Sequence, residues 1–245
     1  QGTLPKGISP EDYPLDASTP KTIMGIPGVV DNANAIGYKS ISVPGAVAGL
    51  SAAVERYGRL GLDTVLIPAI QLAEHGLPVN WFTTLQIALE AAELEKFPAS
   101  AEIYLPNNAP PKPEQHLNLG NLTATLRSLA NDGPNEFYNG SIAASLSSDL
   151  RAGGSRIVLE DLAAYQPILS APLAHEHRDA ILYTPGETSG GPRLNEALRI
   201  IADQLDPTRP FGAHAYKTYA RALNKAFLDH ESRLKFSNTA GSTSH

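Results

Sequence analysis

The stretch SVPGAVAGL, residues 42–50, lies at the start of a helical pattern. Apolar residues recur at intervals of three and four from Val47 to Tyr57, which is the period of one helix face. Pro44 lies near the expected first turn, where proline is favoured, and Gly58 is typical of a position just beyond a helix end. The stretch therefore predicts a helix that ends near residue 58.

The same period recurs along the chain and predicts a mainly helical protein. The further expected helices cover about residues 67–74, 81–96, 122–130, 142–152, 194–201 and 214–235, the last with Tyr216, Tyr219, Leu223 and Phe227 on one face. The apolar and aromatic run 180–184 predicts a strand, because charge precedes it and Pro185-Gly186 follows it. Segment 98–113 is rich in Pro and Asn, which favours a surface loop.

Three regions differ in composition. Residues 1–40 hold five prolines among glycines and small polar residues, so we expect an extended lead-in that wraps over another surface. Residues 41–236 hold the periodic segments. Residues 237–245 are small and polar, so we expect a flexible tail that is not helical.

Composition excludes several classes of protein. The 245 residues suffice for one large domain or two small ones, and 42% hydrophobic with 18% charged residues excludes a disordered chain. A net charge of −6 and a pI near 5.6 argue against nucleic acid or an anionic membrane as partner. No segment has the roughly 20 apolar residues of a membrane span. Without cysteine there is no disulfide, thiolate metal site or cysteine nucleophile.

Residue chemistry alone offers few candidate sites. His175-Glu176-His177 places two imidazoles on one strand face, but no third metal ligand follows at a familiar spacing, so we favour exposed polar residues before the strand. Asp229-His230-Glu231 diverge around a helix, which favours a solvated face over an acid/base cluster. Ser189-Gly190-Gly191 precedes a helix and indicates close packing rather than an anion site.

Several motifs agree in order and spacing with a known family. Over about residues 35–235 the chain resembles the large-subunit region of the gamma-glutamyltranspeptidase family. The motifs are SVPGAVAGL (42–50), Tyr57-Gly58, PAIQLAEHGLPV (68–79), FYNGSIA (137–143), Gly153-Gly154, DLAAY (161–165), Tyr183-Thr184-Pro185 and Ser189-Gly190-Gly191. Their glycines suit helix ends and close approaches, and Asp161 is expected to cap a helix that begins near Leu162.

The resemblance implies an α/β fold, the mainly helical large-subunit part of an α-β-β-α N-terminal-nucleophile hydrolase sandwich. It implies a precursor that cuts itself into a large and a small subunit, and a new N-terminal threonine that attacks the substrate. The implied substrates are gamma-glutamyl amides such as glutathione, or related acyl amides, and no metal or other cofactor is implied. The partner is the small subunit from the same precursor.

The chain departs from the family pattern at both ends. It lacks the early glycine-rich stretch and the arginine that grips the substrate carboxylate, so no residue is assigned to substrate binding. It also lacks the small subunit, so alone it should be inactive. We expect Gln1 to be a processing point or the start of a fragment. The resemblance favours a periplasmic or secreted location, and a cytoplasmic one stays open.

Thr243 is the candidate nucleophile, because Thr243-Ser244-His245 resembles the start of the family's small subunit. In that register the scissile bond follows Ser242. In a second register, His245 ends the large subunit and the threonine begins a separate chain, and Thr243 as an ordinary tail residue is a third interpretation. Residues 237–245 thus lie at or near the expected self-cleavage site.

The leading interpretation is the large subunit of a gamma-glutamyltranspeptidase-like enzyme. One alternative on the same scaffold is a cephalosporin or glutaryl acylase, or a poly-gamma-glutamate-processing enzyme. Another, from a different class, is a non-catalytic binding fragment.

Overall fold

The computed structural model describes residues 3–19, 27–186, 189–206 and 208–240, and beyond His230 it describes the side chain of Ser232 alone. The chain divides into two compact units, which we call the N-terminal unit (residues 2–167) and the C-terminal unit (residues 168–245). No helix among the described residues is both long and apolar enough to cross a membrane.

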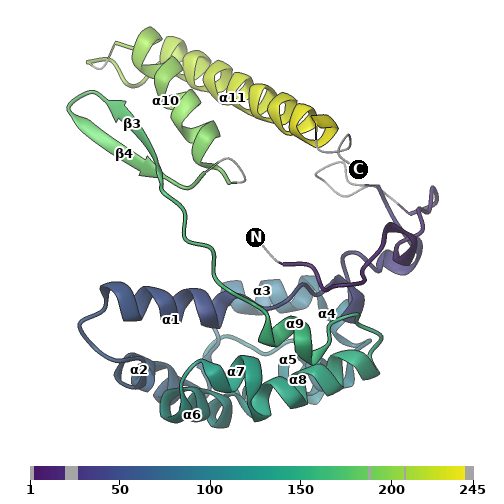
Figure 1. Ribbon diagram of the computed structural model, residues 1–245. Helices are drawn as coiled ribbons and strands as arrows, with labels where there is room; N and C mark the ends of the chain where they lie inside the picture. Colours follow the sequence, from purple (N-terminus) through teal and green to yellow (C-terminus); the bar gives the residue numbers. More distant parts are fainter. Residues whose placement is uncertain (1–2, 20–26, 187–188, 207, 241–245) are drawn as a thin grey trace. The chain divides into compact units, whose positions relative to one another are not determined.

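The N-terminal unit is built from helices (Figure 1). They are α1 Ala46–Tyr57, α2 Leu62–His75, α3 Trp81–Leu89, α4 Ala91–Leu94, α5 Pro98–Tyr104, α6 Leu122–Asp132, α7 Asn135–Asn139, α8 Ser141–Ala152 and α9 Leu159–Ala163. Two short strands, β1 Leu77–Pro78 and β2 His116–Leu117, pair antiparallel. Four 3₁₀ turns complete it: η1 Pro10–Asp12, η2 Val30–Asn32, η3 Tyr38–Ser40 and η4 Pro106–Asn108.

Most predicted helices of this unit are confirmed, with three differences in extent. α2 begins at Leu62 rather than near 67, because the helix accommodates Pro68 in its interior. The expected helix 81–96 breaks at Glu90 into α3 and α4. The prediction of a loop over 98–113 is wrong for 98–104: Pro98 occupies the first turn of α5, where its missing N–H costs no helical hydrogen bond.

Two buried clusters form the core of the N-terminal unit. The first contains Val43, Tyr138, Ala143, Leu150, Ile157 and Leu162, and the second contains Val79, Ile87, Leu105 and Leu117. The first cluster joins side chains from the motif before α1, from α7, α8 and α9, which are far apart in sequence. These motif segments therefore fold against one another.

The lead-in forms isolated contacts in its described part. Thr3 pairs with Val43 and Leu15 with Val29 as single antiparallel bridges. The backbone N–H of Lys6 donates to Asp161 Oδ1 at 3.0 Å, which fastens the lead-in to α9.

The C-terminal unit contains a β-hairpin and two helices. Strands β3 Leu173–His177 and β4 Ala180–Thr184 pair antiparallel, with Leu173 opposite Thr184. The predicted strand 180–184 is confirmed. Helices α10 Gly191–Gln204 and α11 Ala213–Ala240 pack against each other, and α10 also contacts β3.

α11 differs from the sequence expectation in length. We predicted its end near residue 235 and no helix from 237, whereas the backbone is helical through Ala240. The physical reason is that residues 213–240 contain no glycine or proline, so nothing interrupts the helix.

Candidate functional site

Tyr138 contacts residues of two other motifs and so joins three motifs of the series. Its hydroxyl donates to the Pro44 carbonyl at 2.9 Å and accepts from the backbone N–H of Ala48 at 3.0 Å, in the first turn of α1. Burial raises the pKa of this phenol, so the hydroxyl stays protonated and can donate. Its ring stacks on Tyr165, with centroids 5.6 Å apart.

Gly45 is required by this arrangement. A Cβ at position 45 would overlap the Tyr165 hydroxyl. The residue before α1 must therefore be glycine for Tyr165 to stack on Tyr138. We call Pro44, Gly45, Ala48, Tyr138 and Tyr165 the tyrosine hub.

Asp161 caps α9, but from a different position than we predicted. The helix begins at Leu159, so Asp161 is its third residue rather than its N-cap. Asp161 Oδ2 accepts from the Val158 N–H at 3.1 Å, and Oδ1 accepts from Lys6 N–H. The buried Asp161 carboxylate thus accepts hydrogen bonds both from the backbone at the start of α9 and from the backbone of the lead-in.

Gly191 confirms the packing interpretation of Ser189-Gly190-Gly191. A Cβ at Gly191 would overlap the Pro185 carbonyl at the end of β4. Ser189 Oγ donates to the Gly186 carbonyl at 2.8 Å and accepts from Gly191 N–H at 3.2 Å, which closes the turn before α10. The Ser189 hydroxyl is thus hydrogen-bonded within its own turn.

The two strand histidines share a face, as predicted, but do not form a metal site with a third ligand. The expectation of exposed residues before the strand is wrong for both histidines, which lie within β3 and are half-buried, with ring centroids 6.4 Å apart. Glu176 is exposed on the other face. Within the described residues, no group of three His, Cys, Asp or Glu side chains could hold a metal ion. His175 Nε2 and His177 Nδ1 are buried and have no hydrogen-bond partner there.

Asp229-His230-Glu231 is not a solvated face throughout, so that prediction is wrong for His230. Asp229 pairs with Lys225 at 2.7 Å on the exposed side, but His230 is only 5% exposed. The physical reason is that His230 lies on the buried face of α11, which otherwise consists of small residues and lies one position away from the aromatic face. Its members are Ala215, Thr218, Ala222, Ala226 and His230. Small side chains allow α10 to approach closely.

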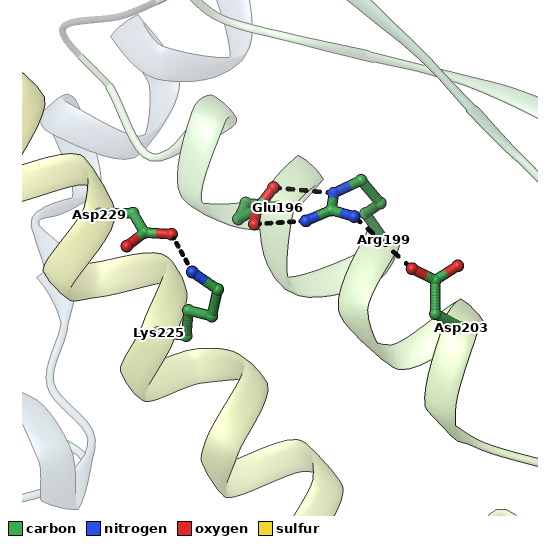
Figure 2. A network of polar contacts seen from close by, with 5 residues as sticks. All are labelled: Glu196, Arg199, Asp203, Lys225 and Asp229. Carbon is green, nitrogen blue, oxygen red and sulfur yellow. Dashed lines mark hydrogen bonds and ion pairs between the residues drawn. The ribbon is translucent and has the colours of Figure 1, made fainter.

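Charged side chains line α10 and α11 (Figure 2). Arg199 forms a bidentate contact with Glu196, at 2.8 and 3.0 Å, and a longer ion pair with Asp203. The Arg199 hydrogen bond holds the pKa of the Glu196 carboxyl below its usual value. These pairs run within single helices and are partly exposed, so solvent screens them and each contributes little to stability.

The described residues contain no evident acid catalyst. The carboxyls in this part of the chain whose pKa is shifted, those of Asp12, Asp16, Glu136, Glu196 and Asp206, all lie below their usual values. Their environments therefore favour the ionised form rather than the protonated form that a general acid donates from.

Thr243 lies outside the described residues, so the candidate nucleophile stays a prediction. α11 is described to Ala240, three residues earlier in the sequence. Sequence reasoning also missed the tyrosine hub as a unit. Its signal was present, because Pro44, Tyr138 and Tyr165 each fall within a motif of the series.

Comparison with known proteins identifies the motif series. A family model described as gamma-glutamyltranspeptidase matches residues 2–242. An acylase ACY 1 proenzyme of Pseudomonas sp. (strain SE83) is 33% identical over 201 residues, covering 81% of this chain and 36% of the relative. A glutathione hydrolase proenzyme of Escherichia coli (strain K12) is 32% identical over 194 residues, covering 78% and 33%. The chain spans about a third of the length of these relatives.

The fold has a counterpart among solved structures. The gamma-glutamyltranspeptidase of Helicobacter pylori matches with a TM-score of 0.82 at 22% identity, over 94% of this chain and 64% of that one. This likeness confirms the predicted fold class, because the chain has the fold of the corresponding part of that structure and is mainly helical.

Proposed function

The chain belongs to the gamma-glutamyltranspeptidase family, and from that premise we propose that it is the large-subunit portion of an enzyme acting on gamma-glutamyl or similar acyl amides. The observation that carries this proposal is the ordered motif series, whose members fold together in the tyrosine hub and the Asp161 cap. Two relatives named as proenzymes support a precursor that is processed.

We propose Thr243 as the nucleophile exposed by self-cleavage after Ser242. Its hydroxyl would attack the substrate's acyl carbonyl and pass its proton to its own α-amine, whose ordinary pKa near 8 suits a base at neutral pH. Backbone N–H groups would hold the oxyanion, the amine would leave with a proton, and a threonine ester would form. Water or an amino-acid amine would then take the acyl group.

The proposed partner is the small subunit, and unpartnered apolar faces of the N-terminal unit support it. α2 is apolar around much of its circumference, which is typical of a helix buried in a larger protein. Large apolar side chains on α1, α2 and α3 are exposed, with Trp81 70% accessible. The others with at least two fifths of their surface exposed are Leu50, Tyr57, Val65, Ile67, Leu72, Phe82, Leu85 and Leu89.

The C-terminal unit has an apolar face of the same kind. The aromatic face of α11, which marked the helix in the sequence, is largely exposed, with Tyr216 61% and Phe227 49% accessible. The small residues of α11 are buried, whereas the larger Tyr216, Leu223 and Phe227 keep about half or more of their surface exposed. The guanidinium of Arg193 on α10 covers part of the Phe227 ring.

Intact-mass measurement and N-terminal sequencing of the purified proenzyme test the proposal. We expect a second polypeptide that begins at Thr243, because the new α-amine is the proposed base. A second chain that begins beyond His245 would support the other register. A proenzyme that stays one chain would contradict self-cleavage and favour the binding-fragment alternative.

Two substrates separate the enzyme alternatives. The processed enzyme is expected to hydrolyse a gamma-glutamyl anilide faster than a glutaryl amide. The glutaryl group lacks the α-amine of the gamma-glutamyl group, so the groups in the site that would bind this amine are left unpaired. Comparing kcat/KM for the two measures this preference. The reverse preference would favour the acylase alternative. This alternative is the second candidate because one relative, 33% identical, is named as an acylase proenzyme.

A further inference from the structure

A cavity of about 410 Å³ lies in the N-terminal unit, between residues 4–13 and residues 34–42. We call it the lead-in cavity. Its volume falls within the range of about 300–1,000 Å³ that is usual for small-molecule sites. Its apolar lining residues are Leu4, Ile8, Pro10, Tyr13 and Ile41.

The two walls of the lead-in cavity are fastened to each other and to the core. Thr3 bridges to Val43 beside one end of the cavity. The Tyr13 hydroxyl donates to the Lys39 carbonyl at 2.8 Å, which ties wall to wall. η1 is also held from outside by the ion pair between Asp12 and Arg156. The cavity is therefore formed before any ligand arrives.

Internal hydrogen bonds use most of the hydroxyl groups that line the cavity. Ser9 Oγ accepts from Glu11 N–H, and Ser40 Oγ donates to the Gly37 carbonyl at 2.7 Å. The Tyr13 hydroxyl donates to the Lys39 carbonyl, as described above. A ligand consequently meets a largely apolar surface.

Lys39 is the cation in the lining. It forms no ion pair within the described residues, because the nearby carboxylate of Asp12 already pairs with Arg156. Both the Arg156 hydrogen bond and, through space, the charge of Lys39 hold the pKa of Asp12 low. An unpaired ammonium beside apolar walls matches a ligand with an anionic end and an apolar body.

We propose that the lead-in cavity binds an aliphatic monocarboxylate, with the carboxylate at Lys39 and the chain along Leu4, Ile8 and Ile41. The proposal does not depend on the acyl-transfer function, because it rests on the lining of the lead-in cavity alone. The carboxylate would take a charge-assisted hydrogen bond, and the chain would leave water for the apolar walls.

Calorimetric titration of the proenzyme with sodium octanoate, below the concentration at which it forms micelles, tests the proposal. Octanoate is expected to bind saturably, and 1-octanol and octylammonium about tenfold or more weakly, because they lack the charge that pairs with Lys39. Decanoate should bind about 9- to 16-fold tighter than octanoate if both added methylenes are buried, since each buried methylene contributes about three- to fourfold.

Matched variants locate the site. Lys39→Glu should weaken octanoate binding about tenfold or more, whereas Lys112→Glu, the same change at another exposed lysine, should leave it unchanged. Leu4 is 64% exposed, so Leu4→Asn should weaken binding while leaving the fold intact. Absence of saturable binding, equal affinity for octanoate and octanol, or octanoate affinity unaffected by Lys39→Glu would overturn the proposal.

Discussion

Replacing Thr243 with alanine is expected to leave the proenzyme as one polypeptide and to lower hydrolysis of a gamma-glutamyl anilide by on the order of 10³-fold or more. The side-chain hydroxyl is proposed to attack both the preceding peptide bond and the substrate. Alanine has no group that can form the ester. Both the cleavage and the catalytic activity should therefore be lost, as measured by denaturing electrophoresis and initial rates.

The neighbouring serines provide the control for this prediction. Ser242→Ala and Ser244→Ala each remove a hydroxyl beside Thr243 without touching the proposed nucleophile. Both variants are expected to cleave, and Thr243→Ser to cleave slowly, because it keeps a hydroxyl at the same position. Cleavage at the normal rate in Thr243→Ala would place the nucleophile elsewhere and would favour the register in which His245 ends the large subunit.

Local sequence patterns predicted those elements whose limits are set by nearby residues. α1, α6 and α8 each combine a period of three and four with a glycine at the end, and the strand 180–184 lies between charge and Pro185-Gly186. α5 was missed because Pro and Asn indicate a loop by composition. A proline at the first helical position is compatible with either structure.

Packing over long sequence distances could not be predicted in this way. The bulky residues of α11 marked the helix correctly but not its buried face, because the close approach of α10 favours the small face containing Ala222 and Ala226. The same applies to the candidate site. The hydroxyl of Tyr138 forms hydrogen bonds with residues 90 and 94 positions away in the sequence. Local periodicity cannot predict contacts over such a sequence separation.

The tyrosine hub makes Tyr138 a position where substitution should strongly destabilise the N-terminal unit. Tyr138 is only 6% exposed, and truncation to alanine would remove the ring that stacks on Tyr165 and leave a cavity. Tyr138→Ala is expected to destabilise the N-terminal unit by about 3–5 kcal/mol. Tyr138→Phe keeps the ring but leaves the partly buried Pro44 carbonyl and Ala48 N–H without their partner, which costs about 1–3 kcal/mol.

Hydrogen exchange distinguishes the lost hydroxyl from general destabilisation, because the chain has two units and its unfolding need not be a single transition. In Tyr138→Phe the Ala48 amide should exchange faster than the amides of α6, since the phenol is its acceptor. Tyr183→Phe is the matched control, because Tyr183 is 64% exposed on β4. Unchanged protection at Ala48 would mean that the Tyr138 hydroxyl does not stabilise the first turn of α1. The motifs would then be joined by the packing of the tyrosine rings beside Gly45.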